Sequence, residues 1–138
     1  MSRELGNALF EEPCRVTVSD LRLQIAKHGA YFYPDVMVAH GPSTSADMIS
    51  NPTVIVEVLS PSTELWDRTG KFALYRQVES LREYVLVSQE AVRVEWFTRQ
   101  EGGWFYQEAT GAEAVCRLES LNVTLSLGRI YKEWLLNQ

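Results

Sequence analysis

Runs of apolar residues separated by turn-forming residues predict a chain rich in β-strands. Residues 53–59 form the most apolar run, and the lack of polar alternation there indicates a strand buried on both faces in the middle of a sheet. Apolar and polar residues alternate over residues 14–19 and 21–25, which predicts one or two half-buried strands. Five further strands are predicted, over residues 31–39, 83–88, 93–99, 104–109 and 121–125.

Apolar positions three or four residues apart predict helices between these strands. They are expected over residues 3–11, 65–78 and 127–136. Gly70 weakens the middle helix by about 1 kcal/mol relative to alanine. Because that helix lies between two strands, a parallel strand pair joined by a right-handed crossover is the default arrangement. The pattern as a whole predicts an α/β or α+β fold, with a sheet flanked by helices.

Turn-forming residues predict how the remaining strands connect. Residues 31–39 are expected to pair with residues 22–25 as an antiparallel hairpin, with Pro34 marking an edge or a bulge just before Asp35. Residues 40–52 are rich in Pro, Ser and Thr and predict a loop. The strands over residues 93–99 and 104–109 should form a second hairpin around Gly102 and Gly103.

Length and composition narrow the class of protein. The 138 residues suit one domain, and 46% hydrophobic with 22% charged residues is typical of a folded globular chain. A net charge of -5 argues against broad electrostatic capture of nucleic acid, although Arg68, Lys71, Arg76 and Arg82 could form a local basic cluster. The two cysteines have no metal-binding or redox spacing. No apolar run reaches membrane length, so a cytoplasmic protein is expected.

Two acidic residues interrupt predicted strands where burial would favour apolar side chains. They are Asp35 and Glu57, which fall on what should be adjacent strands. An unpaired buried carboxylate costs several kcal/mol, so such a group normally has a partner or a metal. Two converging carboxylates would make an oxygen site suited to Mg²⁺ or Mn²⁺, and Lys71 could stabilise charge that develops beside it. The alternatives are a turn or strand-end acid at Asp35 and an arginine partner for Glu57.

Asp67, Lys71 and Tyr75 are spaced i, i+4 and i+8 and share one face of the predicted helix. If that face looks onto the carboxylates, these residues belong to the same site. The alternative is an exposed ion pair worth about 0.2–0.5 kcal/mol. The aromatic residues of the second hairpin favour a role in the core or on the sheet face over base stacking, and they are Trp96, Phe97, Trp104, Phe105 and Tyr106.

These residues, taken together, resemble the Uma-two family of restriction-endonuclease-like proteins, within the PD-(D/E)XK nuclease superfamily. The resemblance covers nearly the whole chain. It rests on the following segments: Tyr33-Pro34-Asp35, residues 57–63 (EVLSPST), Asp67 with Lys71 and Tyr75, Glu83-Tyr84, residues 13–16 (PCRV) and residues 19–22 (SDLR).

The resemblance implies a restriction-endonuclease-like mixed central β-sheet flanked by helices. It also implies Mg²⁺- or Mn²⁺-dependent endonuclease activity on DNA, with Asp35 and Glu57 as metal-binding acids and the Val58 carbonyl as a further ligand. The superfamily lysine usually lies two residues after the acid, where this chain has Leu59. Lys71 on the following helix would be the relocated equivalent.

Three further expectations accompany the resemblance. Family members carry a hairpin before the part that matches Arg3-Glu4-Leu5, so the single domain over residues 1–138 is expected to be N-terminally shortened. A homodimer would suit a nuclease that must reach two strands. The alternative functions are a non-catalytic nuclease-fold protein that binds protein or nucleic acid, and a truncated inactive copy.

Overall fold

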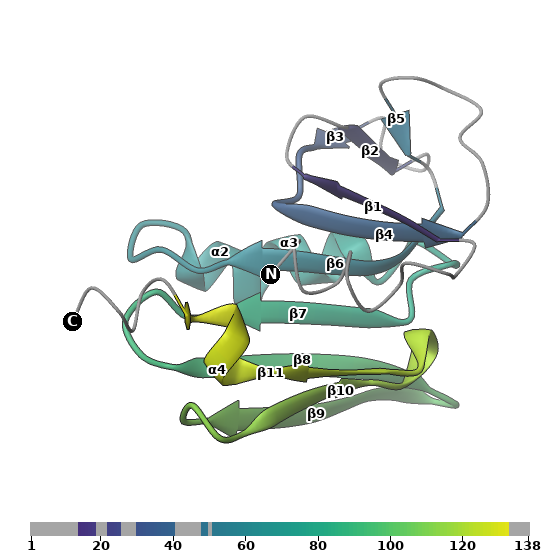
Figure 1. The fold of residues 1–138 in the computed structure, drawn as a ribbon. Helices are drawn as coiled ribbons and strands as arrows, with labels where there is room; N and C mark the ends of the chain where they lie inside the picture. The colour runs from purple at the N-terminus through teal and green to yellow at the C-terminus, as the bar shows by residue number, and fades with distance from the viewer. Residues whose placement is uncertain (1–13, 19–21, 26–29, 41–47, 50, 133–138) are drawn as a thin grey trace.

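The computed structural model of the chain describes residues 14–18, 22–25, 30–40, 48–49 and 51–132. A six-stranded mixed sheet with the order β1-β4-β6-β7-β8-β9 forms its centre (Figure 1). The strands of this sheet are β1 (Cys14–Val18), β4 (Val36–His40), β6 (Pro52–Val58), β7 (Glu83–Val87), β8 (Arg93–Gln100) and β9 (Gly103–Thr110). The described residues include no helix that is long and apolar enough to cross a membrane.

The expected parallel pair lies in the middle of this sheet. β6 and β7 are parallel, with Glu57 beside Leu86, and the remaining neighbours in the sheet are antiparallel. All residues of β6 except the last are buried, because β6 has strands on both sides and packed side chains on both faces. The prediction of a central strand over residues 53–59 and a parallel strand over residues 83–88 is therefore confirmed.

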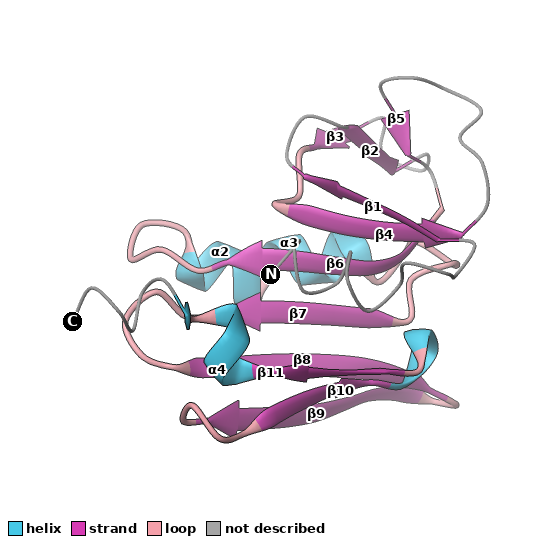
Figure 2. Ribbon diagram, viewed as in Figure 1, coloured by secondary structure: helices cyan, strands magenta, loops and turns pink. Residues whose placement is uncertain are grey.

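Two smaller sheets flank the central one (Figure 2). β2 (Arg22–Ile25) lies between antiparallel β3 (Ala30–Phe32) and parallel β5 (Met48–Ile49). β10 (Val115–Leu118) and β11 (Val123–Ser126) form an antiparallel pair, with the 3-10 helix η1 (Glu119–Leu121) between them and α4 (Leu127–Ile130) after them. β5, β10 and η1 were not predicted from the sequence.

The segment over residues 31–39 is two strands, not one. β3 ends at Phe32 and β4 begins at Val36, with Pro34 in the break. Proline has no amide hydrogen to continue a ladder. β3 pairs with β2 as expected, but β4 pairs with β1 and β6. The irregularity in the ladder lies between Val38 and Ala39, so the bulge predicted at Pro34 is wrong.

Three other predicted boundaries change. The single helix over residues 65–78 is two short helices, α2 (Glu64–Arg68) and α3 (Gly70–Tyr75). The loop over residues 40–52 contains β5, and the last strand starts at Val123 because η1 precedes it. The helix predicted over residues 3–11 and the end of the helix predicted over residues 127–136 lie outside the described residues.

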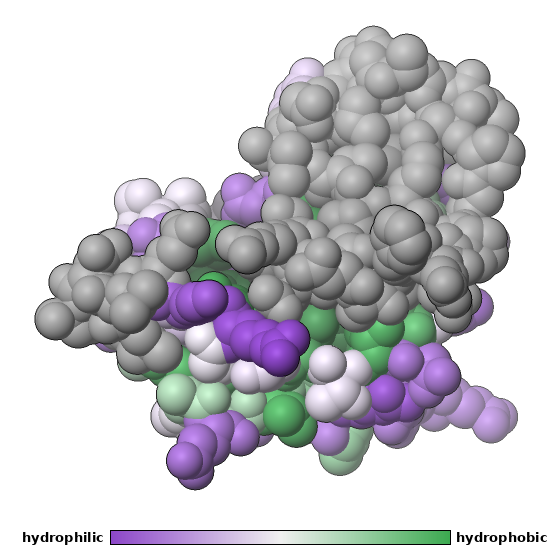
Figure 3. Space-filling view, in the orientation of Figure 1, coloured by the Kyte–Doolittle hydropathy of each residue, from purple (hydrophilic) through white to green (hydrophobic). Residues whose placement is uncertain are grey.

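Each face of the central sheet carries a hydrophobic core. One core joins alternate residues of β4, β6, β7 and β8 to the β10–β11 pair and α4, and it includes the buried free Cys116, whose pKa burial raises to about 12. The other core joins the intervening residues to α3 through Phe72 and Tyr75. Figure 3 shows hydrophobic and hydrophilic side chains mixed over α4 and the β10–β11 pair. Asp35 and Glu57 lie on the face of the central sheet that packs against α3.

Candidate active site

Asp35 and Glu57 lie opposite each other on neighbouring antiparallel strands. The register pairs Val36 with Val56, so Asp35, just before β4, faces Glu57 near the end of β6. The Asp35 amide donates to Glu57 Oε1 at 2.9 Å, and the Val58 amide donates to Asp35 Oδ2 at 2.7 Å. Each carboxylate therefore accepts a hydrogen bond from the backbone of the neighbouring strand. Because cross-strand partners share a face, both acids lie on the α3 side of the sheet.

The Glu57 carboxylate is almost inaccessible to solvent, and its partner is a lysine. The side chain of Glu57 is 3% exposed, and Oε2 forms a short ion pair with Lys71 Nζ. The Tyr75 hydroxyl donates to the same oxygen at 3.4 Å. Burial raises the pKa of Glu57, and the Lys71 contact opposes that rise only in part. The alternative of an arginine partner for Glu57 is wrong, because the partner is Lys71.

Lys71 contacts a second carboxylate as well. Asp67 Oδ1 lies 3.0 Å from Lys71 Nζ, and both side chains are mostly buried, at 3% and 19% exposure. Burial by itself lowers the pKa of Lys71, but its contacts with Glu57 and Asp67 outweigh this effect, so the net pKa is raised. The interpretation of Asp67 and Lys71 as an exposed surface pair is therefore wrong.

Asp67, Lys71 and Tyr75 stay on the side of the two helices that faces Glu57, despite the break between α2 and α3. The Thr69 hydroxyl donates to the Leu65 carbonyl at 2.6 Å, at the point where α2 ends. Just before α2, the Thr63 hydroxyl donates to Asp67 Oδ2 at 3.1 Å. The spacing i, i+4 and i+8 therefore still brings the three side chains toward Glu57, even though no continuous helix carries them.

The backbone of Asp67 is also fixed. The buried Tyr84 hydroxyl donates to the Asp67 carbonyl at 2.8 Å, which ties α2 to β7. Burial, together with the negative charges of Glu57 and Asp67, raises the pKa of Tyr84. Tyr84 therefore remains a hydrogen-bond donor at neutral pH.

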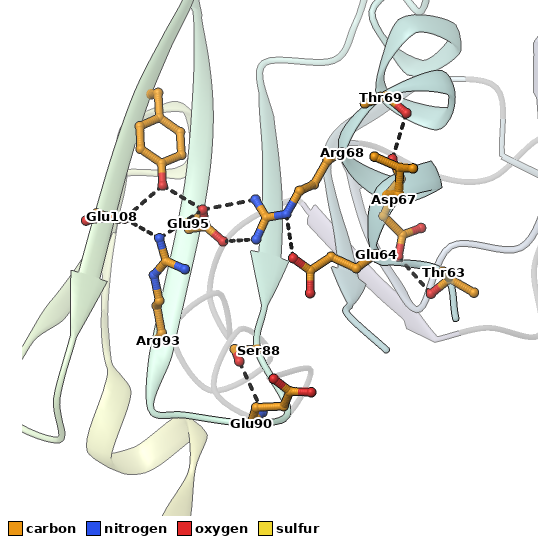
Figure 4. A network of polar contacts seen from close by, with 12 residues as sticks. Thr63, Glu64, Asp67, Arg68, Thr69, Ser88, Glu90, Arg93, Glu95 and Glu108 are labelled. Atoms are coloured by element: carbon orange, nitrogen blue, oxygen red, sulfur yellow. Dashed lines mark hydrogen bonds and ion pairs between the residues drawn. The ribbon is translucent and has the colours of Figure 1, made fainter. Parts of the chain in front are cut away.

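A charged network on the same face anchors α2 to the far strands of the sheet (Figure 4). Arg68 donates to both oxygens of Glu95 on β8, at 3.0 and 2.7 Å, and to Glu64 at 2.9 Å. Tyr106 donates to Glu95 at 2.6 Å, and Arg93 lies 3.3 Å from it. These contacts hold the residue next to Asp67 in a fixed position.

The donor set fits a magnesium-like ion in its chemistry. Carboxylates from neighbouring strands are oxygen ligands, and Mg²⁺ is usually bound by one or two carboxylates while it keeps several waters. Within the described part of the chain, no group of three or more His, Cys, Asp or Glu side chains is placed to enclose a metal. The residues present therefore fit an ion that completes its coordination with a backbone carbonyl, waters and substrate. A cation at Glu57 Oε2 would take the place of Lys71.

Asp35, Glu57 and Lys71, the candidate residues from the sequence, thus lie together, and Val58 is bonded to Asp35 through its amide. The i, i+4 spacing indicated that Asp67 could pair with Lys71, but it did not show whether the pair is buried. Burial of the pair depends on how α2 packs on the sheet. The sequence also gave no indication of the Arg68 and Glu95 contact.

Comparisons with known proteins agree on one family and one fold. Residues 1–128 match the protein family Uma2, described as "Putative restriction endonuclease". In Synechocystis sp. (strain ATCC 27184 / PCC 6803 / Kazusa), the uncharacterized protein slr1290 is 35% identical over 129 residues, which are 91% of this chain and 67% of that protein. The uncharacterized protein sll1609 of the same organism is 40% identical over 116 residues, which are 80% of this chain and 63% of that protein.

The chain thus spans about two thirds of the length of these two relatives. A solved structure also matches, that of a protein from Anabaena variabilis ATCC 29413 described as a putative nuclease belonging to DUF820. It superposes with a TM-score of 0.74 at 15% identity, covering 95% of this chain and 75% of that one. At that identity the match shows the fold alone, and the fold is mixed α+β, as predicted.

Proposed function

The chain belongs to the Uma2 family, and from that premise we propose that it is a divalent-metal-dependent endonuclease of the PD-(D/E)XK type that hydrolyses phosphodiester bonds in DNA. One observation carries the proposal. Asp35 and Glu57 face each other on neighbouring strands, and each carboxylate accepts a hydrogen bond from the backbone of the other's strand. Lys71 forms an ion pair with Glu57. A pair of acids of this kind, with Glu57 buried and Asp35 half-buried, has no evident use in the core, where burying charge is costly.

The proposed roles follow from these contacts. Asp35, Glu57 and the Val58 carbonyl would hold Mg²⁺ or Mn²⁺. Such an ion, when bound, polarises a phosphoryl oxygen and lowers the pKa of a water molecule. The amide of Val58 fixes the orientation of the Asp35 carboxylate, and the amide of Asp35 does the same for Glu57. Preorganised ligands of this kind need little rearrangement when the cation arrives.

Lys71 would stabilise the negative charge that develops on the phosphate. Its ammonium group already lies beside Glu57, so a phosphate next to that carboxylate would be within its reach. Asp67, 3.0 Å from the same nitrogen, would keep Lys71 in place after the cation takes its position at Glu57. A preorganised ammonium group in a partly buried site acts more strongly than one in water.

Plasmid nicking by the purified protein tests the proposal. We expect conversion of supercoiled DNA to open circles with Mg²⁺ or Mn²⁺ and none with EDTA. Asp35→Ala and Glu57→Ala should each abolish nicking, whereas Glu90→Ala, an exposed acid in a turn, should have no effect. Equal activity in wild type, Asp35→Ala and Glu57→Ala would show that the nuclease is a contaminant or that the site is elsewhere. Thermal melting of each variant separates loss of activity from loss of fold.

A further inference from the structure

Three arginines gather where α3 ends and β7 begins. Arg76 follows α3 directly, Arg82 directly precedes β7, and Arg99 is on β8. The Arg99 amide donates to the Arg82 carbonyl at 2.8 Å, and the Arg99 guanidinium donates to the Arg76 carbonyl at 2.8 Å. We call Arg76, Arg82 and Arg99 the arginine patch.

Aromatic rings support two members of the arginine patch. The Arg76 guanidinium lies 4.8 Å from the centre of the Phe72 ring, and that of Arg99 lies 4.6 Å from the centre of the Trp104 ring. The two rings meet edge to face at 5.3 Å. Stacking on a ring restricts a long side chain, so both guanidinium groups are held in place before any ligand binds.

The arginine patch carries positive charge that no neighbouring acid neutralises directly. Arg68 and Arg93 form ion pairs with Glu64, Glu95 and Glu108, but no carboxylate of the described residues pairs with Arg76, Arg82 or Arg99. Burial, and then the charge of Arg82, lower the pKa of Arg99, while Glu79 opposes them. Arg76 and Arg82 are exposed to solvent, so the patch presents local positive charge on a chain whose net charge is -5.

We propose that the arginine patch binds the sugar–phosphate backbone of the DNA substrate, at a distance from the cleaved bond. The inference rests on the proposed function. An arginine offers five N–H donors. In Arg99 the contacts to the Arg76 and Val78 carbonyls use Nη2 and Nε is buried, which leaves Nη1 for phosphate oxygens.

The position of the patch suits a strand that also reaches the site. Lys71 is near the start of α3 and Arg76 follows its end, a rise of about 7.5 Å for five residues. That is about the rise of two nucleotides in one strand of a duplex. The separation along α3 between Lys71 and Arg76 thus corresponds to a few nucleotides of one strand.

A shallow depression beside the patch contributes little to this binding. Thr53, Ser80, Arg82 and Ser120 line it, but the Ser80 hydroxyl donates to the Pro52 carbonyl and the Ser120 hydroxyl donates to buried Glu83. Most of its hydroxyl hydrogens are therefore engaged. Arg82 is the cationic donor at this depression, so we assign the phosphate contact to the guanidinium.

The test measures how DNA binding depends on salt. A 20-base-pair duplex is titrated with the full chain in EDTA, where no metal-dependent cleavage occurs, at several salt concentrations. Arg76→Gln/Arg82→Gln removes two exposed members of the patch, and Arg117→Gln/Arg129→Gln removes two exposed arginines elsewhere. Both variants have the same net charge. Melting temperatures confirm that both are folded.

Each lost phosphate contact should reduce the slope of log K against log [salt] by about 0.9. We therefore expect Arg76→Gln/Arg82→Gln to reduce the slope by about 1.8, and the control variant to keep it. The affinity of the wild type should then fall about tenfold further than that of the patch variant between 50 and 200 mM salt. This result supports the proposal.

Two results overturn it. One is the absence of duplex binding by the wild type at the lowest salt concentration. The other is equal slopes in the two double variants, in which case an acidic protein segment becomes the better candidate partner for the arginine patch. Failure of the proposed function gives a different result, namely DNA binding that depends on the patch without any nicking in Mg²⁺ or Mn²⁺.

Discussion

Lys71 lies between two buried carboxylates, and this position determines how the site would respond to a cation. Its nitrogen contacts Glu57 and lies 3.0 Å from Asp67. In the proposed site, a divalent ion and the Lys71 ammonium group would compete for the same Glu57 oxygen. Asp67 offers Lys71 an alternative partner, so it should lower the cost of displacing Lys71 from Glu57.

Asp67→Asn should therefore weaken Mn²⁺ binding through Lys71 rather than by loss of a ligand. Calorimetry on wild type, Asp67→Asn, Lys71→Met and the double variant measures this coupling. We expect the Lys71→Met variant to bind Mn²⁺ more tightly than wild type and the Asp67→Asn variant to bind it about fivefold more weakly. In the double variant, Asp67→Asn should have little effect, because Lys71 is already absent.

Glu64→Gln is the matched control, because Glu64 is on the same helix but contacts Arg68. It should leave Mn²⁺ affinity unchanged. If Asp67→Asn weakens binding equally with and without Lys71, then Asp67 acts on the cation directly and the positioning role is wrong.

At the residue scale, the sequence identified the acids better than their partners. Glu57 and Asp35 could be predicted because each is a single acid within an apolar run, where burial would favour an apolar side chain. Lys71 came from the family resemblance and from helical spacing. The burial of Asp67 could not be predicted, because it depends on the packing of α2, which ends at Arg68 instead of continuing as one helix to residue 78.

At the scale of elements, α2 depends on its contact with β8. The helix has five residues, too few to be stable alone, and Arg68 joins it to the nearly buried Glu95 through two hydrogen bonds. Sequence periodicity predicted one helix over residues 65–78, and the weakness at Gly70 was visible. The break itself was not predicted, because it reflects packing that includes the Trp66 ring, which fills the space beside Gly70.

Arg68→Met should destabilise the protein by about 2 kcal/mol, less than the loss of a fully buried ion pair, because the Arg68 side chain is 29% exposed. The loss is limited because Tyr106 and Arg93 still contact Glu95. Urea unfolding measures the change, and Arg117→Met, an exposed arginine on β10, is the control. A change below about 0.5 kcal/mol would mean that α2 does not need this anchor.

The same contact predicts how stability depends on pH. Burial alone raises the pKa of Glu95, but its hydrogen bonds with Arg68 and Tyr106 outweigh this effect, so the pKa is lowered. A lowered pKa means that the ionised carboxylate stabilises the fold above the unfolded value of about 4.5, and that this contribution is lost as pH falls through the folded value.

Glu95→Gln should therefore be less stable than wild type at pH 7, and the difference should shrink below about pH 4.5. Thermal melting across the pH range measures the stability difference at pH 7 and its change at lower pH, with Glu90→Gln as the exposed control. A difference that does not change with pH would show that the ionised form of Glu95 is not what stabilises the fold.

At the scale of the whole molecule, the central sheet presents two different faces. One packs against β10, β11 and α4, and the other supports α2, α3 and the acids. The mixed sheet and its parallel pair could be predicted, since a strand, a helix and a strand in succession favour a crossover. The division of residues 31–39 between two sheets could not, because β4 pairs with β1, which lies far from it in sequence.

The most direct test of the central claim is a crystal structure with Mn²⁺, located by its anomalous scattering. We predict one strong peak about 2.1 Å from the carboxylates of Asp35 and Glu57, with Lys71 moved from Glu57 toward Asp67. A crystal grown in Mn²⁺ that shows no anomalous peak between the two acids and Lys71 still in contact with Glu57 would contradict the account.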